Sequence, residues 1–328
     1  MSKAYPIERS PLYRMRNRSK LAELLCLPKD YFTHGHEHIY TKFSRPKPNG
    51  DGVRKFTVPQ GELEIIQKRV YRLLSRIETP DWVMSGKKHR SYITNAKKHV
   101  ESSFVKTMDI SQFYDSVQKG YIYKMFNDTF MMADDIAWIM TDLVTCEEAL
   151  PTGSPTSQLI IYWTYSKMFD LINNIALKYN CLFTLYVDDM TFSANIPISK
   201  ELRDEVAAVL KKNGLKAKAK KDHYYQTNAF KVITGVGISK KQMAVPNNKR
   251  KKVLDQYKKC KGNHNLSDIE KLRGMLCAVR QIEPEIFPEV HNFVKHYNSE
   301  LAKYARNRYY KNQRLRRKAT ENICSISG

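Results

Sequence analysis

The stretch CLFTLYVDDMTFSAN, residues 181–195, decides the fold. It holds two runs of apolar and β-branched residues, which predict two strands joined by a tight turn. Alternation along the first strand places Phe183 and Leu185 on one face and Asp188 on the other. The stretch therefore predicts an antiparallel hairpin with Asp188 and Asp189 at its tip.

A second acidic strand end lies upstream. Residues 102–110 also predict a strand, in which Asp109 shares a face with Val105 and Thr107. Aspartates at two strand ends that face one cleft repel each other unless a cation lies between them. Mg²⁺ suits such a site because it binds carboxylate oxygens together with substrate phosphates. An Asp-Asp pair in a hairpin is often ordinary turn chemistry, but the apolar strands and the second acidic strand favour a functional site.

The rest of the chain predicts an α+β middle followed by a helical end. Residues 39–43 and 53–58 predict short strands around a turn rich in Pro, Asn, Asp and Gly. Apolar residues at helical spacing predict helices over 62–77, 121–146, 156–179 and 201–213. The helix over 156–179 is expected to be continuous. A capping box at Ser267 and Glu270 predicts a further helix through Val279.

The chain is strongly basic. Its 328 residues include 56 Lys and Arg against 33 Asp and Glu, a formal net charge of +23. Residues 246–328 hold 19 basic and 8 acidic residues, with one run at 249–252 and a second over 303–318 that is interleaved with tyrosines. Cations beside stacking rings predict binding to single-stranded or looped nucleic acid. A surface that is basic only for solubility, and a tail without a fixed role after Lys311, are the alternatives.

Other features of the composition narrow the class of protein. Apolar residues make up 42% of the chain, enough for a sizeable core, which excludes general disorder. No apolar run approaches the ~20 residues of a membrane span, so a cytoplasmic protein without a membrane partner is expected. The six cysteines include no C-x-x-C pair, which argues against a zinc ribbon. His34, His36 and His38 could form a metal patch, although a strand edge or loop is the simpler interpretation.

Five pieces of the sequence, in order, resemble the motifs of reverse transcriptases. YVDD at 186–189 resembles the Y-x-D-D box, and FVKTMDISQFY at 104–114 resembles the motif of the first aspartate. LPTGSPTS at 150–157 resembles the P-x-G-x-P-T-S turn, and RKFTVP at 54–59 resembles the fingers hairpin. Gly214 and Leu215, followed by Lys220 and Lys221, resemble the lysine motif.

Two further pieces resemble one branch, the bacterial retron reverse transcriptases. NAKKH at 95–99 resembles their N-A-x-x-H box, and ITG at 233–235 resembles their V-T-G element with Ile for Val. Thr152 stands where many members carry Gln, and Gln158 where many carry Pro. Both departures put the template preference in doubt rather than the chemistry.

The resemblance implies a right-hand polymerase. It would have a basic extension over 1–40, fingers over 41–100, a palm of antiparallel sheet and helices over 101–243, and an all-helical, RNA-binding thumb over 244–328. It also implies the reaction. The enzyme would copy a structured non-coding RNA into single-stranded multicopy DNA (msDNA), primed from the 2′-OH of an internal guanosine.

The resemblance also assigns roles to individual residues. Two Mg²⁺ ions would be bound by Asp109, Asp188 and Asp189 with the backbone carbonyl of Ile110. Lys221 would act on the leaving group, with Lys220 as a rival. For the incoming dNTP, Arg54 would meet the triphosphate, Gly153 would lie in the nucleotide-binding turn, and Tyr114 would exclude a ribose 2′-OH.

RNA contacts are expected from the retron-like pieces and from the first basic run: Asn95, His99, Thr234, Gly235, Lys249, Arg250, Lys251 and Lys252. Asn95 and His99 could instead stabilise the junction of fingers and palm. A separate effector protein in anti-phage defence is an expected partner. Two alternatives stay open: another small bacterial reverse transcriptase, of group II intron or diversity-generating type, and a non-catalytic RNA-binding scaffold of a defence complex.

Overall fold

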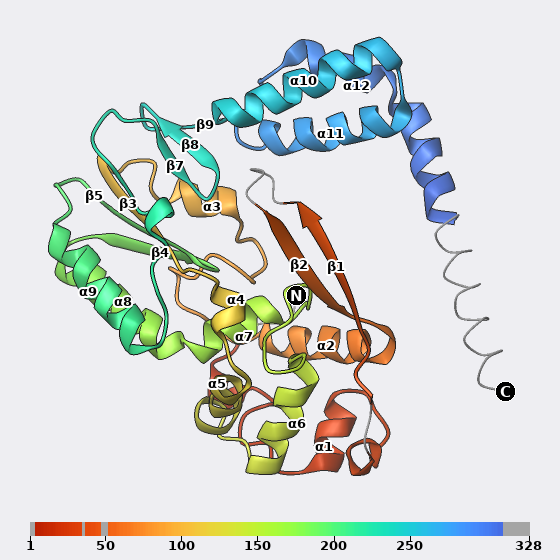
Figure 1. Cartoon of the computed structure of the whole chain (residues 1–328), viewed down its shortest axis with the longest axis vertical. Helices are drawn as coiled ribbons and strands as arrows, with labels where there is room; N and C mark the ends of the chain where they lie inside the picture. The colour runs from red at the N-terminus through yellow and green to blue at the C-terminus, as the bar shows by residue number, and fades with distance from the viewer. Residues whose placement is uncertain (1–3, 35–36, 47–51, 311–328) are drawn as a thin grey trace. The chain divides into compact units, whose positions relative to one another are not determined.

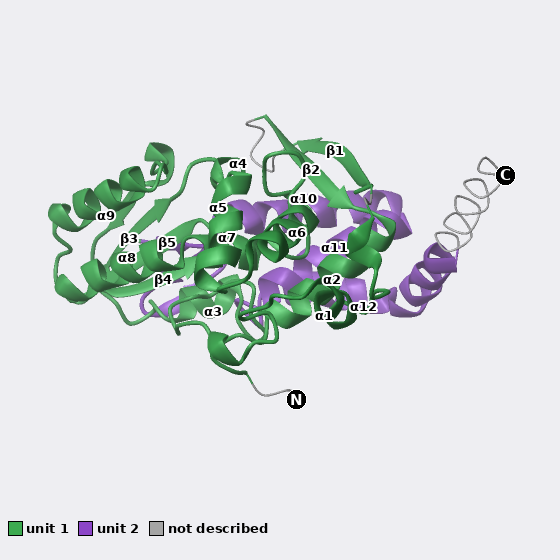
Figure 2. Ribbon diagram, turned by 90° about the horizontal axis from the view of Figure 1, so that it is seen from below, with its two compact units in different colours: residues 1–229 green, residues 230–328 purple. Residues whose placement is uncertain are grey.

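The computed structural model describes residues 4–34, 37–46 and 52–310. The chain divides into two compact units, Met1–Ala229 and Phe230–Gly328 (Figure 2). The second unit thus begins before the boundary at 243/244 that was expected between palm and thumb.

Unit 1 mixes helices with two antiparallel sheets (Figure 1). Its helices are α1 (Arg18–Leu24), α2 (Gly61–Leu74), α3 (Tyr92–Lys97), α4 (Phe113–Ser116), α5 (Lys119–Lys124), α6 (Asp134–Val144), α7 (Ser157–Thr164), α8 (Ser166–Lys178) and α9 (Lys200–Lys212). Its strands are β1 (Tyr40–Pro46), β2 (Val53–Pro59), β3 (Phe104–Asp109), β4 (Leu182–Tyr186), β5 (Asp189–Ala194) and β6 (His223–Tyr225). The hairpins, the helix α2 and the helix α9 confirm the elements expected from the sequence.

The larger sheet has the strand order β4-β5-β3-β6, and its two faces differ in chemistry. One face carries Met108, Phe183 and Phe192, which belong to a buried apolar cluster together with side chains of α7 and α8. The other face carries buried Thr184, Thr191 and Ser193 and ends at the aspartates. Because side chains alternate along a strand, the same pattern that buries the phenylalanines turns the hydroxyls and carboxylates to the opposite side.

The single helix expected over 156–179 is wrong. The chain forms α7 and α8, separated at Tyr165, where φ is −112° and ψ is 18°. Thr164 Oγ1 donates to the carbonyl of Ile160 (2.8 Å) and Ser166 Oγ to that of Trp163 (3.1 Å). Such side-chain bonds compete with the helical ladder. At the break, the ring of Tyr165 packs against that of Phe113, with their centroids 5.6 Å apart.

Unit 2 begins with a small sheet of β7 (Lys231–Ile233), β8 (Val236–Ser239) and β9 (Gln242–Ala244). It continues as α10 (Asn247–Asn263), α11 (Leu266–Arg280) and α12 (Pro288–His296), and residues 298–310 are helical. None of the helices in the described ranges is both long and apolar enough to cross a membrane.

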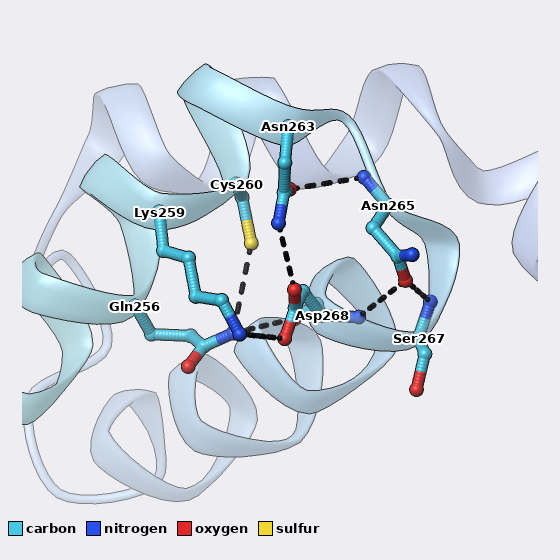
Figure 3. Close-up of polar contacts among 7 residues, drawn as sticks. All are labelled: Gln256, Lys259, Cys260, Asn263, Asn265, Ser267 and Asp268. Carbon is cyan, nitrogen blue, oxygen red and sulfur yellow. Dashed lines mark hydrogen bonds and ion pairs between the residues drawn. The ribbon is translucent and has the colours of Figure 1, made fainter.

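The turn between α10 and α11 is held by Asp268, as Figure 3 shows. Its carboxylate accepts from Lys259 Nζ (2.9 Å) and Asn263 Nδ2 (2.8 Å), and Gln256 Nε2 donates to its backbone carbonyl (3.1 Å). The N-cap of α11 is Asn265, whose side chain accepts from the backbone of Ser267 (2.9 Å) and Asp268. The expected helix is therefore present, but the expected capping box at Ser267 is wrong: the helix begins earlier, and Asn is an equally good cap.

Candidate active site

The register of the larger sheet brings the three aspartates together. Asp109, the last residue of β3, is the direct partner of Asp189, the first residue of β5. Tyr186 pairs with Asp189, so Val187 and Asp188 form a two-residue hairpin loop. The backbone N–H of Ile110 donates to the carbonyl of Asp188 (3.1 Å), which holds the loop against the end of β3. The carboxylates expected from the sequence therefore do meet at one point.

The hairpin tip contains a backbone outlier. Val187 has φ +58°, a conformation that hairpin loops usually assign to Gly and that a β-branched residue rarely adopts. Its N–H donates to Oγ of buried Ser85 (3.0 Å). Ser85 itself carries no sequence signal, and its neighbour Gly86 is the residue that could have marked this place. Gly86 has φ +69°, and a Cβ there would lie 2.9 Å from Leu159. Strain of this kind persists where the surroundings hold it, and it gathers at functional sites.

Burial and mutual repulsion disfavour ionisation of the acids. Burial, with the charge of Asp109 adding to it, raises the pKa of Asp188 to about 6. Burial and the charge of Asp188 raise the pKa of Asp189 to about 7. Both pKa values are also raised by hydrogen bonding to the side chain of Asp109. Crowded carboxyl groups of this kind need either protons or cations between them.

Lys221 supplies a positive charge at this point. Its ammonium makes an ion pair with Asp109 and lies 3.7 Å from Oδ1 of Asp189. Burial alone lowers the pKa of this ammonium, but the hydrogen bond to Asp109 and the three negative charges outweigh it, so the pKa of Lys221 is raised. Lys220 is exposed. The structure therefore separates the two rival lysines by placing Lys221 beside the acids.

The donor chemistry of the site fits divalent cations. Three carboxyl groups meet at the end of β3, where Asp109 is buried and Asp188 and Asp189 are half-buried, and carboxylate oxygens are the preferred ligands of hard cations. Within the described residues, no group of three or more His, Cys, Asp or Glu side chains is already arranged to hold a metal ion, and the Lys221 ammonium pairs with Asp109.

Of the residues expected to bind the nucleotide, Tyr114 lies near both Asp188 and Arg54, and Gly153 lies against β2. Burial and the charge of Asp188 raise the pKa of Tyr114 to about 12, and the charge of Arg54 opposes that rise. The hydroxyl of Tyr114 is thus within electrostatic range of both Asp188 and Arg54. Arg54 is exposed on β2. Gly153 donates its N–H to the Thr57 carbonyl (3.0 Å), and a Cβ there would lie 2.5 Å from Val58. Only Gly allows the turn to lie directly against β2.

Asn95 and His99 both lie away from solvent. Both side chains are 0% exposed. His99 Nδ1 lies 2.7 Å from Ser193 Oγ, and Nε2 lies 2.7 Å from Thr184 Oγ1. The ring thus joins the polar faces of β4 and β5, the two strands that carry the aspartate loop. This burial favours the alternative left open by the sequence, stabilisation of a junction, over direct contact with RNA.

Thr234 and Gly235 form the loop of the β7–β8 hairpin. Ile233 pairs with Val236, and both loop residues have positive φ, +46° and +78°. A two-residue loop of this kind favours Gly for its backbone conformation. A Cβ on Gly235 would lie 3.3 Å from Nζ of Lys249, so the loop packs against the start of α10.

The four residues of the basic run differ in their surroundings. Arg250 makes two bonds to the carboxylate of Glu283 (2.7 and 2.9 Å) and one to the carbonyl of Val245 (2.9 Å), so its guanidinium is used within unit 2. Burial lowers the pKa of Lys249. Lys251 and Lys252 are exposed. The tyrosine-containing basic run lies outside the described residues from 311 onward. His36 of the histidine patch also lies outside them.

The chain belongs to the reverse transcriptase family. The family model described as reverse transcriptase (RNA-dependent DNA polymerase) matches residues 45–254, which include the three aspartates, Lys221 and strand β2. The resemblance seen in the sequence is thereby confirmed, and the protein is an RNA-directed DNA polymerase by class.

The chain is also similar to curated retron reverse transcriptases. The retron Ec86 reverse transcriptase of Escherichia coli is 24% identical over 237 residues, which cover 70% of this chain and 72% of the relative. The retron Se72 reverse transcriptase of Salmonella heidelberg is 25% identical over 172 residues, 51% of this chain and 44% of the relative. The retron Mx65 reverse transcriptase of Myxococcus xanthus is 23% identical over 219 residues, 61% and 51% respectively. The chain thus spans about half the length of the last two.

Proposed function

We propose that this reverse transcriptase copies a structured non-coding RNA into msDNA, starting from the 2′-OH of a guanosine within that RNA. The observation that carries the proposal is the meeting of Asp109, Asp188 and Asp189 with Lys221 at the end of β3, in a chain similar to retron enzymes. The basic composition supports an RNA partner.

In this proposal the acids would hold two Mg²⁺ ions, with Asp109 and Asp188 as the main ligands and Asp189 and the Ile110 carbonyl beside them. When bound, such ions lower the pKa of an attacking hydroxyl and stabilise a leaving phosphate. Lys221, freed from Asp109, would neutralise the leaving pyrophosphate. Arg54 on β2 would pair with the triphosphate, because a guanidinium can form two bonds to phosphate oxygens.

Tyr114 would set the choice of sugar. Its ring is half-buried, and the charge of Asp188 is near enough to help raise the pKa of its hydroxyl. A bulky side chain at this place would clash with the 2′-OH of a ribonucleotide and would admit dNTPs. The fingers, palm and thumb would correspond to residues 41–100, 101–243 and 244–328, and a separate effector protein would link DNA synthesis to anti-phage defence.

The test is a reaction with the RNA encoded beside the gene. Purified protein, this RNA, dNTPs and Mg²⁺ should yield DNA joined to the RNA through a 2′–5′ linkage, which a debranching enzyme cleaves. DNA that lacks this linkage, together with efficient copying of generic primed RNA, would favour another small bacterial reverse transcriptase. An unchanged biological activity in an Asp188→Asn variant would favour the non-catalytic scaffold.

A further inference from the structure

Gln67 is a polar residue on the buried, otherwise apolar face of α2. It lies on α2 between buried Leu63, Ile66 and Val70, and its side chain is 0% exposed. Burying an amide is unfavourable unless its donors and acceptor are bonded. Gln67 meets this requirement with three partners. Nε2 donates to the Leu143 carbonyl (2.8 Å) and to Tyr40 Oη (3.1 Å), and Oε1 accepts from Ser154 Oγ (2.5 Å).

These partners belong to different parts of unit 1. Leu143 lies at the end of α6, Tyr40 begins β1, and Ser154 lies in the turn 151–156. Tyr40 Oη in turn donates to the Thr145 carbonyl (2.8 Å). Ser154 Oγ also accepts from the Thr156 backbone N–H (3.2 Å). We call Gln67, Tyr40 and Ser154 the Gln67 clasp.

The same turn is bonded to the other strand of the hairpin. Thr152 Oγ1 donates to the Lys55 carbonyl (2.8 Å), and the Gly153 N–H donates to the Thr57 carbonyl (3.0 Å). The turn is therefore linked to β2 directly and to β1 through the Gln67 clasp. These bonds hold the backbone of β2 next to Arg54 at a fixed place relative to the turn.

We propose that Gln67 is a positioning residue for the incoming nucleotide: through the clasp it keeps the hairpin that carries Arg54 in one place relative to the turn 151–156. The inference rests on the proposed DNA polymerase reaction. It explains why a buried amide stands in an apolar helix face.

The test compares three variants in single-nucleotide extension on a generic primed RNA. Gln67→Met keeps most of the volume and removes the amide. Tyr40→Phe keeps the ring and removes the hydroxyl, with its bond from Gln67 and its bond to the Thr145 carbonyl. Thr141→Val is the matched control, because its buried hydroxyl lies on α6 and donates to the Ala137 carbonyl (2.7 Å), outside the clasp. The measurements are KM for dNTP, kcat and the melting temperature.

We expect Gln67→Met to raise KM for dNTP about tenfold, less than the roughly 10²-fold that a 1 Å misplacement can cost. Tyr40→Phe should also raise KM for dNTP. The double variant should have nearly the same KM as Gln67→Met alone, because both changes break one hydrogen-bond network. Thr141→Val should lower the melting temperature without changing KM.

Three results would overturn the inference. KM unchanged in Gln67→Met while wild type extends primers would remove the role of Gln67 and leave the polymerase proposal standing. Wild-type protein that extends no primer would remove both. If Gln67→Met fails to fold, an unchanged KM in Tyr40→Phe decides against the clasp.

Discussion

Replacing His99 by Ala tests whether this buried histidine acts through the fold or through RNA. The change removes both ring contacts, to Ser193 and Thr184. Ser193 keeps a bond from Ser102 Oγ (2.9 Å), whereas the ring is the partner found for Thr184, which is 0% exposed. Removing two hydrogen bonds at about 1 kcal/mol each, together with the void left by the ring, predicts a loss of about 2–4 kcal/mol.

A loss of this size should lower the melting temperature by on the order of 10 °C. Because β4 and β5 carry the aspartate loop, DNA synthesis on the cognate RNA and extension of a generic annealed primer should fall together. Lys97→Ala, an exposed change on α3, is the control and should alter neither. A loss confined to the cognate RNA, at an unchanged melting temperature, would refute the structural explanation and restore a direct RNA contact.

The pH dependence of stability gives a second measure of the same residue. Burial, with the nearby charge of Lys98 adding to it, lowers the pKa of His99 from 6.5 to about 3. The unfolded chain therefore binds the proton more readily than the folded chain. The contribution of His99 to the free energy of unfolding is fully present above about pH 6.5 and is lost as the pH falls toward 3. At pH 5 the expected loss is about 2 kcal/mol. Denaturant unfolding at pH 7.5 and pH 5 should show a smaller difference for His99→Gln, which does not titrate; an equal difference would contradict burial of a neutral ring.

Three further predictions concern the chemistry, the sugar and the RNA. Asp109→Asn or Asp188→Asn should reduce dNTP extension by more than the roughly 10²–10³-fold that removal of one electrostatic donor costs, while RNA binding is retained; near-normal Mg²⁺-dependent extension would show that the site is assigned wrongly. Tyr114→Ala should admit ribonucleotides, as measured by the ratio of kcat/KM for dNTP and NTP, and an unchanged ratio would remove Tyr114 from this role. Reversing Lys251 and Lys252 to Glu should flatten the plot of log affinity for single-stranded RNA against log salt by roughly 0.7 for each phosphate that is no longer neutralised; an unchanged slope would mean that these lysines face only solvent.

Local pattern was enough to place the acids. In the hairpin around Asp188 and in the strand that ends at Asp109, the alternation of apolar and polar residues sets which side chains share a face, and this alternation is a property of any strand. The order of the motifs then led to the reverse transcriptase family, which the family model confirms. The α7–α8 break could not be seen in the same way, because helical spacing continues across Tyr165 and the break depends on local bonds from Thr164 and Ser166.

Only the tertiary structure decided which polar residues are buried and what they contact. Lys220 and Lys221 are neighbours in sequence, but the bend after Lys218 places only the second beside Asp109. Asn95 and His99 look like surface residues of a basic segment, yet packing of α3 against β4 buries both. Gln67 carries no sequence signal, since its partners on β1, on α6 and in the turn 151–156 come from distant parts of the chain. The sequence pattern determines on which face of its own helix or strand a side chain lies. The residues that it contacts there are determined by the packing of distant segments of the chain.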